Sequence, residues 1–259
     1  MSDSLYVAAT GMHAQQRQLD VIANNLANTN TTAFKKSRVD FGDLMYHSAT
    51  NETRSSLTSD ITDPVGVGTS PSQVGKIFSA GETKKTERPL DLAILGDGFF
   101  EVVLPDGSYG YTRSGAMRQN SEGMITTMDG HPLSSLVQVP DDATELVIKT
   151  DGTVMAMMAG EDTLTEIGSI ELARFVNPRG LNPMGDNLYM PSEKSGRAIY
   201  GMPGEDGNGS VAQGYLESSN VKLIEELTNM ILAQRIYEIN SKVIQASDEV
   251  MGMVNNLRR

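Results

Sequence analysis

The sequence predicts an α+β protein in which long N- and C-terminal helices form a coiled-coil-like assembly domain, with a mainly antiparallel β body between them. Three observations lead to this fold class. Apolar residues recur at helical spacing at both ends of the chain, frequent turn signals divide the middle, and the negative charge is confined to the middle. The expected domains are a discontinuous helical assembly domain of residues 1–35 and 220–259, an extended connector of residues 36–69, and a β-rich outer domain of residues 70–219.

The N-terminal helix is predicted from apolar residues that follow one another at alternating steps of three and four. In this series only Gln15 is polar, and the spacing persists for three heptads. Such a stripe is typical of a helix that packs along its length against another helix. The apolar positions of the stripe are Leu5, Ala8, Met12, Leu19, Ile22 and Leu26.

The C-terminal helix repeats this pattern without a polar interruption. Its main stripe is Leu232, Ile236, Ile239, Val243, Ala246, Val250, Met253 and Leu257. A second stripe is Leu223, Leu227, Met230, Tyr237, Ile244 and Met251. A surface helix of a globular domain needs only one apolar face, so this helix is expected to have partners on two sides. An ordinary antiparallel helix pair that closes one domain also fits the pattern, but the position of the helices at opposite ends of the chain favours assembly between chains.

The middle of the chain is expected to form β-strands because short apolar runs alternate with turn signals. The turn signals are Pro105-Asp106-Gly107, Ser121-Glu122-Gly123, Asp129-Gly130, Asp151-Gly152, Asn177-Pro178-Arg179-Gly180 and Asn182-Pro183-Met184-Gly185. The strand candidates between such turns are residues 92–95, 99–104, 124–127, 146–149, 152–156 and 167–175. The connector before them is rich in serine and threonine and offers little to a core.

The charge distribution separates the ends of the chain from its middle. The net charge is −12, and residues 1–35 and 220–259 are each neutral, so the middle carries all of it. A neutral helix can pack against copies of itself without repulsion, whereas an acidic body suits a solvated surface. A chain this acidic is repelled by phosphate backbones, so a nucleic-acid partner is not expected.

Catalytic and metal-binding chemistry is not expected from this sequence. The chain has no cysteine, and its three histidines, His13, His47 and His131, are scattered without ligand spacing. The glycine pairs near Gly66 and Gly96 lack the rest of a nucleotide-binding fingerprint and are interpreted as turns. We therefore predict no catalytic residue, no metal site and no cofactor. No apolar run is long enough to cross a membrane, and the start of the chain has no signal-peptide pattern.

Several motifs resemble those of the flagellar rod and hook axial family. Ala23-Asn24-Asn25-Leu26-Ala27-Asn28, followed by Thr31-Thr32-Ala33-Phe34-Lys35, is similar to the N-terminal motif of the family. The chain departs from it at Ala33, where the family usually has glycine. If the backbone there had a positive φ, alanine would be strained, so the substitution argues against such a backbone.

The resemblance extends to the middle and the end of the chain. Residues 91–100 (DLAILGDGFF) and 111–115 (YTRSG) are similar to strand and turn motifs of the family, and residues 213–221 (QGYLESSNV) and 234–242 (QRIYEINSK) to its C-terminal helix region. The distal rod branch in particular is indicated by Asn177-Pro178-Arg179-Gly180-Leu181 and Gly185-Asp186-Asn187-Leu188-Tyr189.

The resemblance implies a structural subunit of the bacterial flagellar distal rod, and no enzyme. Such subunits polymerise into a hollow helical shaft, with terminal helices around an axial channel, that transmits torque across the periplasm to the hook. The implied partners are copies of the chain itself, proximal rod and hook-side axial proteins, surrounding ring proteins and the flagellar export apparatus, which exports the chain without a cleaved signal peptide. The alternatives are a proximal rod subunit, or an oligomeric secreted module that binds a ligand.

Asparagines at the end of the first helix have two interpretations. Asn24, Asn25 and Asn28 lie beside the apolar stripe, where amide hydrogen bonds between subunits could fix the register of assembly. Alternatively, Asn28 and Asn30 cap and end the helix. Together with the two apolar stripes named above, Asn24, Asn25 and Asn28 complete the predicted assembly interface.

Overall fold

The computed structural model describes residues 2–44, 46–48, 64–66, 68–160 and 163–257. The chain divides into two compact units. The helical unit comprises Met1–Ala27, Ser37–Gly75 and Lys222–Arg259, and the β unit comprises Asn28–Lys36 and Lys76–Val221. The predicted domain boundaries stay a prediction.

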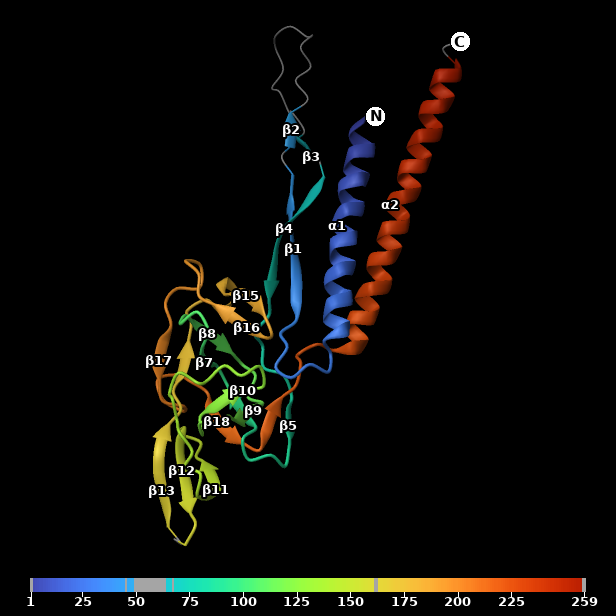
Figure 1. Cartoon of the computed structure of the whole chain (residues 1–259). Coiled ribbons are helices and arrows are strands. Elements are labelled where there is room, and N and C mark those ends of the chain that lie inside the picture. Colours follow the sequence, from blue (N-terminus) through green and yellow to red (C-terminus); the bar gives the residue numbers. More distant parts are fainter. Residues whose placement is uncertain (1, 45, 49–63, 67, 161–162, 258–259) are drawn as a thin grey trace. The chain divides into compact units, whose positions relative to one another are not determined.

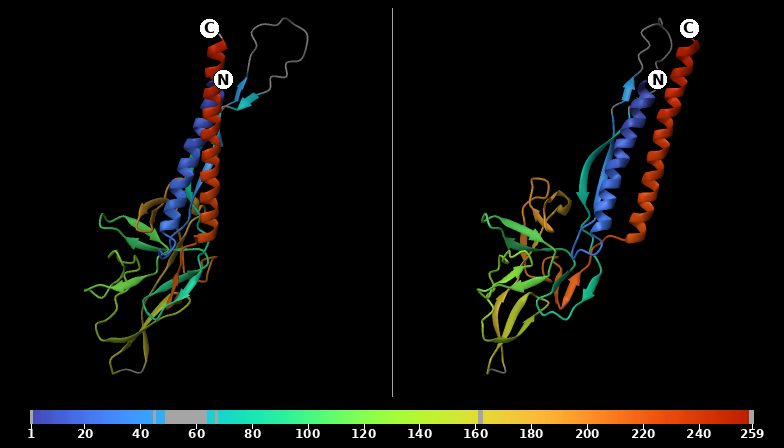
Figure 2. Two further views of the ribbon diagram at one scale, coloured as in Figure 1. Left: turned by 90° about the vertical axis from the view of Figure 1, so that its right-hand side faces the viewer. Right: turned by 45° about the vertical axis from the view of Figure 1, so that its right-hand side comes forward.

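The helical unit contains the helices α1 (Ser2–Ala27) and α2 (Leu223–Leu257), which lie side by side in antiparallel orientation (Figures 1 and 2). Asn25 near the end of α1 contacts Glu226 near the start of α2. Fourteen residues earlier in α1 and fourteen residues later in α2, Gly11 lies against Asn240, as expected for antiparallel helices. A Cβ atom at Gly11 would stand 2.9 Å from the Asn240 amide nitrogen, so this glycine permits the close approach of the helices.

The predicted coiled-coil-like assembly domain is wrong for this structure. The residues described form two helices, and these pack as a single pair. The main stripe of α2 does not face α1, because Leu232, Ile239 and Met253 are each 58% exposed. The face that α2 turns to α1 instead contains Glu226 and Asn240, and helical spacing places Ala233 and Ile244 on the same face.

The physical reason is that α2 has more apolar surface than one helix can cover. A heptad pattern identifies stripes that avoid water, but it does not say which stripe the chain's own partner takes. Gly11 of α1 lies against Asn240 of α2, and helical spacing places Ala233 on the same face of α2 as Asn240.

A two-stranded ribbon completes the helical unit. Strand β1 (Ser37–Asp43) pairs with β4 (Thr69–Lys76), whose last residue already belongs to the β unit, and β2 (Tyr46–Ser48) pairs with β3 (Pro64–Gly66). The Thr69 backbone N–H donates a hydrogen bond to the Thr10 hydroxyl of α1 at 3.4 Å. The predicted connector is therefore strand where it is described, and its residues 45, 49–63 and 67 lie outside the described part of the chain.

The β unit confirms the expected antiparallel β body. A six-stranded sheet has the order β15-β16-β8-β7-β14-β17, a three-stranded sheet the order β11-β12-β13, and the pairs β9–β10, β6–β18 and β5–β19 surround them. Each pairing with a defined register in this unit is antiparallel. The strands are β5 (Thr83–Lys85), β6 (Leu92–Leu95), β7 (Phe99–Val103), β8 (Tyr109–Thr112), β9 (Met117–Gln119), β10 (Ile125–Thr127), β11 (Ala143–Ile148), β12 (Thr153–Met158), β13 (Leu164–Ser169), β14 (Leu172–Arg174), β15 (Asn182–Gly185), β16 (Leu188–Met190), β17 (Ile199–Gly201), β18 (Ser210–Gln213) and β19 (Tyr215–Glu217), with a 3₁₀ turn η1 (Pro178–Gly180).

The predicted turns and strands agree with these elements except in two places, the first being the predicted turn Asn182-Pro183-Met184-Gly185, which is strand β15. Gly107, Gly123, Gly130 and Gly152 all have positive φ, as tight turns between strands require. The second is the predicted strand of residues 167–175, which is divided between β13 and β14 of different sheets. The break falls at Ile170, whose side chain enters the core while its N–H bonds to the carbonyl of Gly152.

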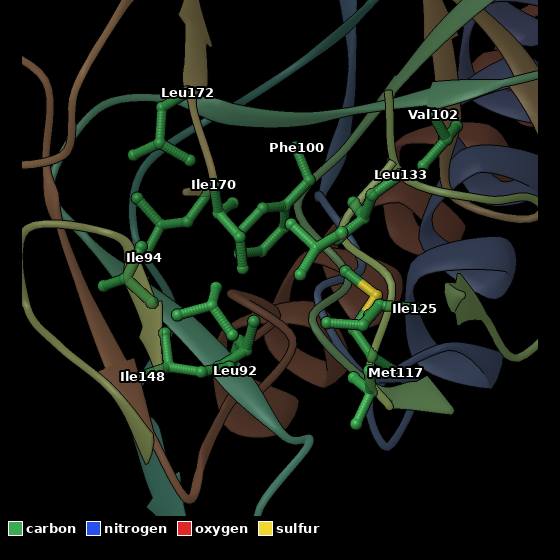
Figure 3. Close-up of a cluster of buried hydrophobic side chains, with 14 of the residues drawn as sticks. Leu92, Ile94, Phe100, Val102, Met117, Ile125, Leu133, Ile148, Ile170 and Leu172 are labelled. Atoms are coloured by element: carbon green, nitrogen blue, oxygen red, sulfur yellow. The ribbon is translucent and has the colours of Figure 1, made fainter. Parts of the chain in front are cut away.

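The core of the β unit is a cluster of aliphatic and aromatic side chains from strands distant in the sequence (Figure 3). Leu92 and Ile94 come from β6, Phe100 from β7 and Leu172 from β14, and all are almost fully buried. Strands β18 and β19, from the end of the unit, pair with β6 and β5 at its start. These two strand pairs join the segment near the start of the β unit to the segment at its end.

Candidate functional site

The predicted interface residues of α2 form an exposed apolar stripe. Leu232, Ile239 and Met253 are the most exposed, Val243 and Val250 are each 42% exposed, and Ala246 is also exposed. Ile236 is half-buried, and only the helical backbone of Leu257 is described, not its side chain. A row of exposed β-branched and leucine side chains on one helix face is typical of a surface that another protein covers.

The predicted interface residues of α1 are less accessible. Ala8 and Ile22 are buried, and Leu5, Met12, Leu19 and Leu26 are half-buried. Among the asparagines Asn24 is exposed, whereas Asn25 is 1% exposed. Of the predicted interface residues, the exposed apolar ones therefore lie mainly on α2.

Asn25 connects three elements of the helical unit. Its Nδ2 donates hydrogen bonds of 2.9 Å to the carbonyl oxygen of Ser37 in β1 and to the carboxylate of Glu226 in α2. Its Oδ1 accepts a hydrogen bond of 2.8 Å from the Ser37 N–H. The amide thus fixes the position of α1 against β1 and α2 within one chain, which is the task that the sequence interpretation assigned to contacts between subunits.

Asn28 lies directly after the last residue of α1, and its role in capping or in register stays a prediction. The helix α1 ends at Ala27, and the Thr31 N–H donates to the Asn28 carbonyl oxygen at 3.2 Å while the Thr31 hydroxyl donates to Asn28 Oδ1 at 3.1 Å. Asn28 therefore organises the turn that follows the helix.

Ala33 has the left-handed backbone that its identity argued against. Its φ is 56°, its side chain is fully buried, and its N–H donates to the Glu217 carbonyl oxygen at 2.8 Å. The inference from the sequence was wrong, because the turn needs this conformation whichever residue occupies it. An alanine in the left-handed region costs about 1–2 kcal/mol, which the burial and the hydrogen bond offset.

A buried ion cluster in the β unit was not predicted. The Glu217 carboxylate accepts hydrogen bonds from Lys35 Nζ at 2.6 Å, the Gly81 N–H at 2.8 Å and Arg113 Nε at 3.0 Å. Lys35 also donates to the Ser79 carbonyl oxygen at 2.8 Å. The side chains of Lys35, Arg113 and Glu217 are at most 3% exposed.

Arg113 uses the rest of its guanidinium group to hold the β6–β7 turn. Nη1 donates to the carbonyl oxygens of Gly96 and Gly98 at 2.9 and 3.0 Å, and Nη2 donates to that of Ile94 at 3.2 Å. Every hydrogen-bond partner of Arg113 is a backbone carbonyl or the Glu217 carboxylate. The carboxylate neutralises the guanidinium charge, and the carbonyl oxygens accept hydrogen bonds from Nη1 and Nη2 in place of water.

The two charge types of the cluster respond differently to burial. Burial alone would raise the pKa of the Glu217 carboxyl, but Arg113, Lys35 and the Gly81 N–H together hold that pKa below its usual range. Burial lowers the pKa of the Lys35 ammonium, and the single carboxylate of Glu217 opposes this only in part while Arg113 adds to it. Glu217 is therefore held ionised between two cations.

The ion cluster brings together three of the sequence motifs that resemble the family. Lys35 ends the N-terminal motif, Arg113 lies in the motif of residues 111–115, and Glu217 lies in that of residues 213–221. The only feature of the sequence that could have predicted the ion cluster was one charged residue inside each of these three motifs, whose other residues are apolar, small or polar without charge. No substrate can reach groups buried this deeply, so the cluster holds the fold together and is unsuited to catalysis.

No metal or membrane site is found in the described part of the chain. It contains no group of three or more metal-type side chains, and neither helix is long and apolar enough to span a bilayer.

Comparisons with known proteins agree along the whole chain. Residues 5–35 match the family described as "Flagella basal body rod protein", residues 93–156 "Flagellar hook protein FlgE/F/G D1 domain", and residues 212–257 "Flagellar basal body rod FlgEFG protein C-terminal". The chain is 42% identical to the flagellar basal-body rod protein FlgG of Borreliella burgdorferi over 265 residues, covering 100% of both chains. It is 39% identical to FlgG of Bacillus subtilis, again over 100% of both chains. It is 32% identical to the flagellar basal-body rod protein FlgF of Caulobacter vibrioides, over 96% of this chain and 95% of that protein.

Proposed function

Because this chain belongs to the family of flagellar basal-body rod proteins, we propose that it is a structural subunit of the distal rod. The observation that carries the proposal is the match to FlgG proteins at 39–42% identity over the full length of both chains. The FlgF relative matches at 32%, which makes a proximal rod subunit the weaker alternative. Copies of the chain polymerise into a hollow helical shaft that transmits torque across the periplasm to the hook.

The exposed stripe of α2 supports polymerisation. Full burial of one leucine, isoleucine, valine or methionine side chain contributes about 1.5–3 kcal/mol, so covering Leu232, Ile239 and Met253 would supply several kcal/mol for each subunit added. No described residue of the same chain covers them. A contact between different surfaces of successive copies generates a helical polymer when its rotation does not close the copies into a ring.

The remaining partners follow from the same premise. Other axial proteins of the rod and hook adjoin the ends of the polymer, and ring proteins surround it. The flagellar export apparatus delivers the chain to the periplasmic side without cleavage of a signal peptide. A structural role of this kind needs no catalytic site, which agrees with a cluster of buried charges that no substrate can reach.

The proposal is tested by polymerisation of the purified protein. At high concentration the parent chain should form helical polymers visible by electron microscopy and recovered by sedimentation. Ile239→Asp should remain soluble and folded, because a carboxylate would replace an apolar side chain at the contact. The matched control is Gln245→Asp, which adds the same charge at another exposed position of α2 and should polymerise.

Two outcomes would contradict the proposal. A parent chain that stays monomeric or forms closed rings at every concentration is not a rod subunit. Polymers of Ile239→Asp that are as abundant as those of Gln245→Asp would show that the stripe on α2 is not the assembly contact.

A further inference from the structure

A pocket in the β unit contains a lysine without a carboxylate partner. The cavity measures about 260 Å³ and brings together the turn after α1 with Asn28 and Thr31, the hairpin turn between β15 and β16, and the last residue of β4, Lys76. It is large enough for one side chain and too small for a strand or a helix.

Lys76 is held in place by uncharged groups. Its Nζ lies 4.3 Å from the centroid of the Phe34 ring and donates to the Lys35 carbonyl oxygen at 3.1 Å. An ammonium group has three protons to donate, so the carbonyl accounts for only one of them. Within the described residues no carboxylate lies at ion-pairing distance from it, and burial lowers its pKa. The pocket therefore holds a half-buried cation with no described carboxylate at ion-pairing distance, although the Asp186 carboxylate lines the same pocket.

The walls of the pocket are rigid. Asp186 and Asn187 have φ of 50° and 56° between the paired residues Gly185 and Leu188, which is the geometry of a tight two-residue hairpin turn. Asn187 Nδ2 donates to the Thr32 carbonyl oxygen at 2.9 Å and ties this turn to the segment after α1. A site that is fixed before its ligand arrives loses little conformational entropy on binding.

We propose that this pocket binds a carboxylate side chain of a second copy of the chain. This inference rests on the proposed function, since polymerisation supplies the second copy. Charge complementarity indicates the occupant: the middle of the chain carries the entire net charge of −12, so a neighbouring subunit presents more carboxylates than cations. The Asp186 carboxylate also lines the pocket, and because like charges repel we expect the incoming carboxylate to bind on the side of Lys76.

Zero-length coupling tests the contact directly. Chains labelled with ¹⁴N and ¹⁵N are mixed, polymerised and treated with a carbodiimide, which activates a carboxyl group so that a touching amine forms an amide with net loss of water. Mass spectrometry should find Lys76 joined to an aspartate or glutamate of a chain with the other label, in the polymer and not in the monomer. Coupling of Lys76 only within its own chain, or no coupling of Lys76 in the polymer, would overturn the proposal.

Variants give an independent measurement. Lys76→Met should raise the concentration needed for polymerisation about tenfold, whereas Lys76→Arg should restore most of the parent behaviour. The matched control is Lys84→Met, which removes an exposed charge on β5 and should have little effect. Circular dichroism checks that each variant is folded. An unchanged polymerisation threshold for folded Lys76→Met contradicts the inference.

Failure of the proposed function is distinguishable from failure of the pocket. If the parent chain never polymerises, the proposed function fails, and the monomer is titrated with glutarate while the amide resonances of Thr31 and Asn187 are followed. Shifts that saturate in the parent and are absent in Lys76→Met support a carboxylate site. No shift in the parent overturns it.

Discussion

Replacement of Glu217 by glutamine is the sharpest test of the buried ion cluster. Glu217→Gln keeps the size and shape of the side chain and removes only its charge. Lys35 and Arg113 then remain as buried cations around a neutral amide, whose NH₂ group faces donors in place of one of the carboxylate oxygens. The Lys35 Nζ binds Oε1 of Glu217 at 2.6 Å and the Arg113 Nε binds Oε2 at 3.0 Å, so the single carbonyl oxygen of glutamine can accept from only one of these two positions.

The expected loss of stability is large. Breaking a buried ion pair by removing one partner costs about 3–5 kcal/mol, because a charge is left buried without compensation. For a unit of this size each 1 kcal/mol corresponds to roughly 2–4 °C, so the melting temperature of the β unit should fall by roughly 6–20 °C. Lys35→Met should cost less than Glu217→Gln, because Arg113 still neutralises Glu217.

Thermal unfolding followed by circular dichroism measures these differences. Adding Lys35→Met to Glu217→Gln should recover part of the lost stability, since it removes one of the two uncompensated cations. A decrease below about 2 °C for Glu217→Gln, or a larger loss for Lys35→Met than for Glu217→Gln, would refute the reasoning, because both follow from the ion cluster carrying two cations and one anion.

Three further predictions follow from the same geometry. Asn25→Ala should lower the free energy of unfolding in urea by about 2–4 kcal/mol, because it removes hydrogen bonds from buried polar groups. The control is Ser37→Ala, which retains the backbone hydrogen bonds to Asn25. Equal losses of stability in the two variants would contradict the role of the Asn25 amide. Ala33→Gly should raise the melting temperature by roughly 1–3 °C, since relief of the left-handed strain exceeds the entropy that glycine gains when unfolded, and a decrease would count against strain at φ 56°. The lowered pKa of Glu217 means that its stabilisation is present above the ordinary pKa of 4.5 and is lost as pH falls through the folded-state pKa, so acid should destabilise the parent more steeply than Glu217→Gln; parallel pH profiles of the two would disprove this.

The sequence by itself determined where the helices and the β body lie. Apolar repeats of three and four residues, interrupted only by Gln15, predicted both terminal helices, and turn signals with glycine predicted the divisions of the middle. These features depend on residues close together in the chain, so local pattern is sufficient to read them. The motifs in the same way identified the family before any fold was known.

The tertiary structure alone decided which surfaces are used. The pattern showed that α2 has two apolar stripes but not which face α1 covers, and in the structure α1 contacts the face with Glu226 and Asn240 while the main stripe stays exposed. Asn25 looked available to another subunit, yet its amide is used within the chain. Ala33 has a left-handed backbone because Glu217, far along the chain, accepts its N–H.

The ion cluster gives the physical reason for this division. Lys35 and Glu217 are 182 positions apart, and neither residue differs in its local sequence from an exposed charge. Only when β5 pairs with β19 and β6 with β18 do the three charged groups meet in a space without water. Local sequence patterns predict which residues are buried, whereas the pairing of strands distant in the sequence determines which charged side chains are buried next to one another.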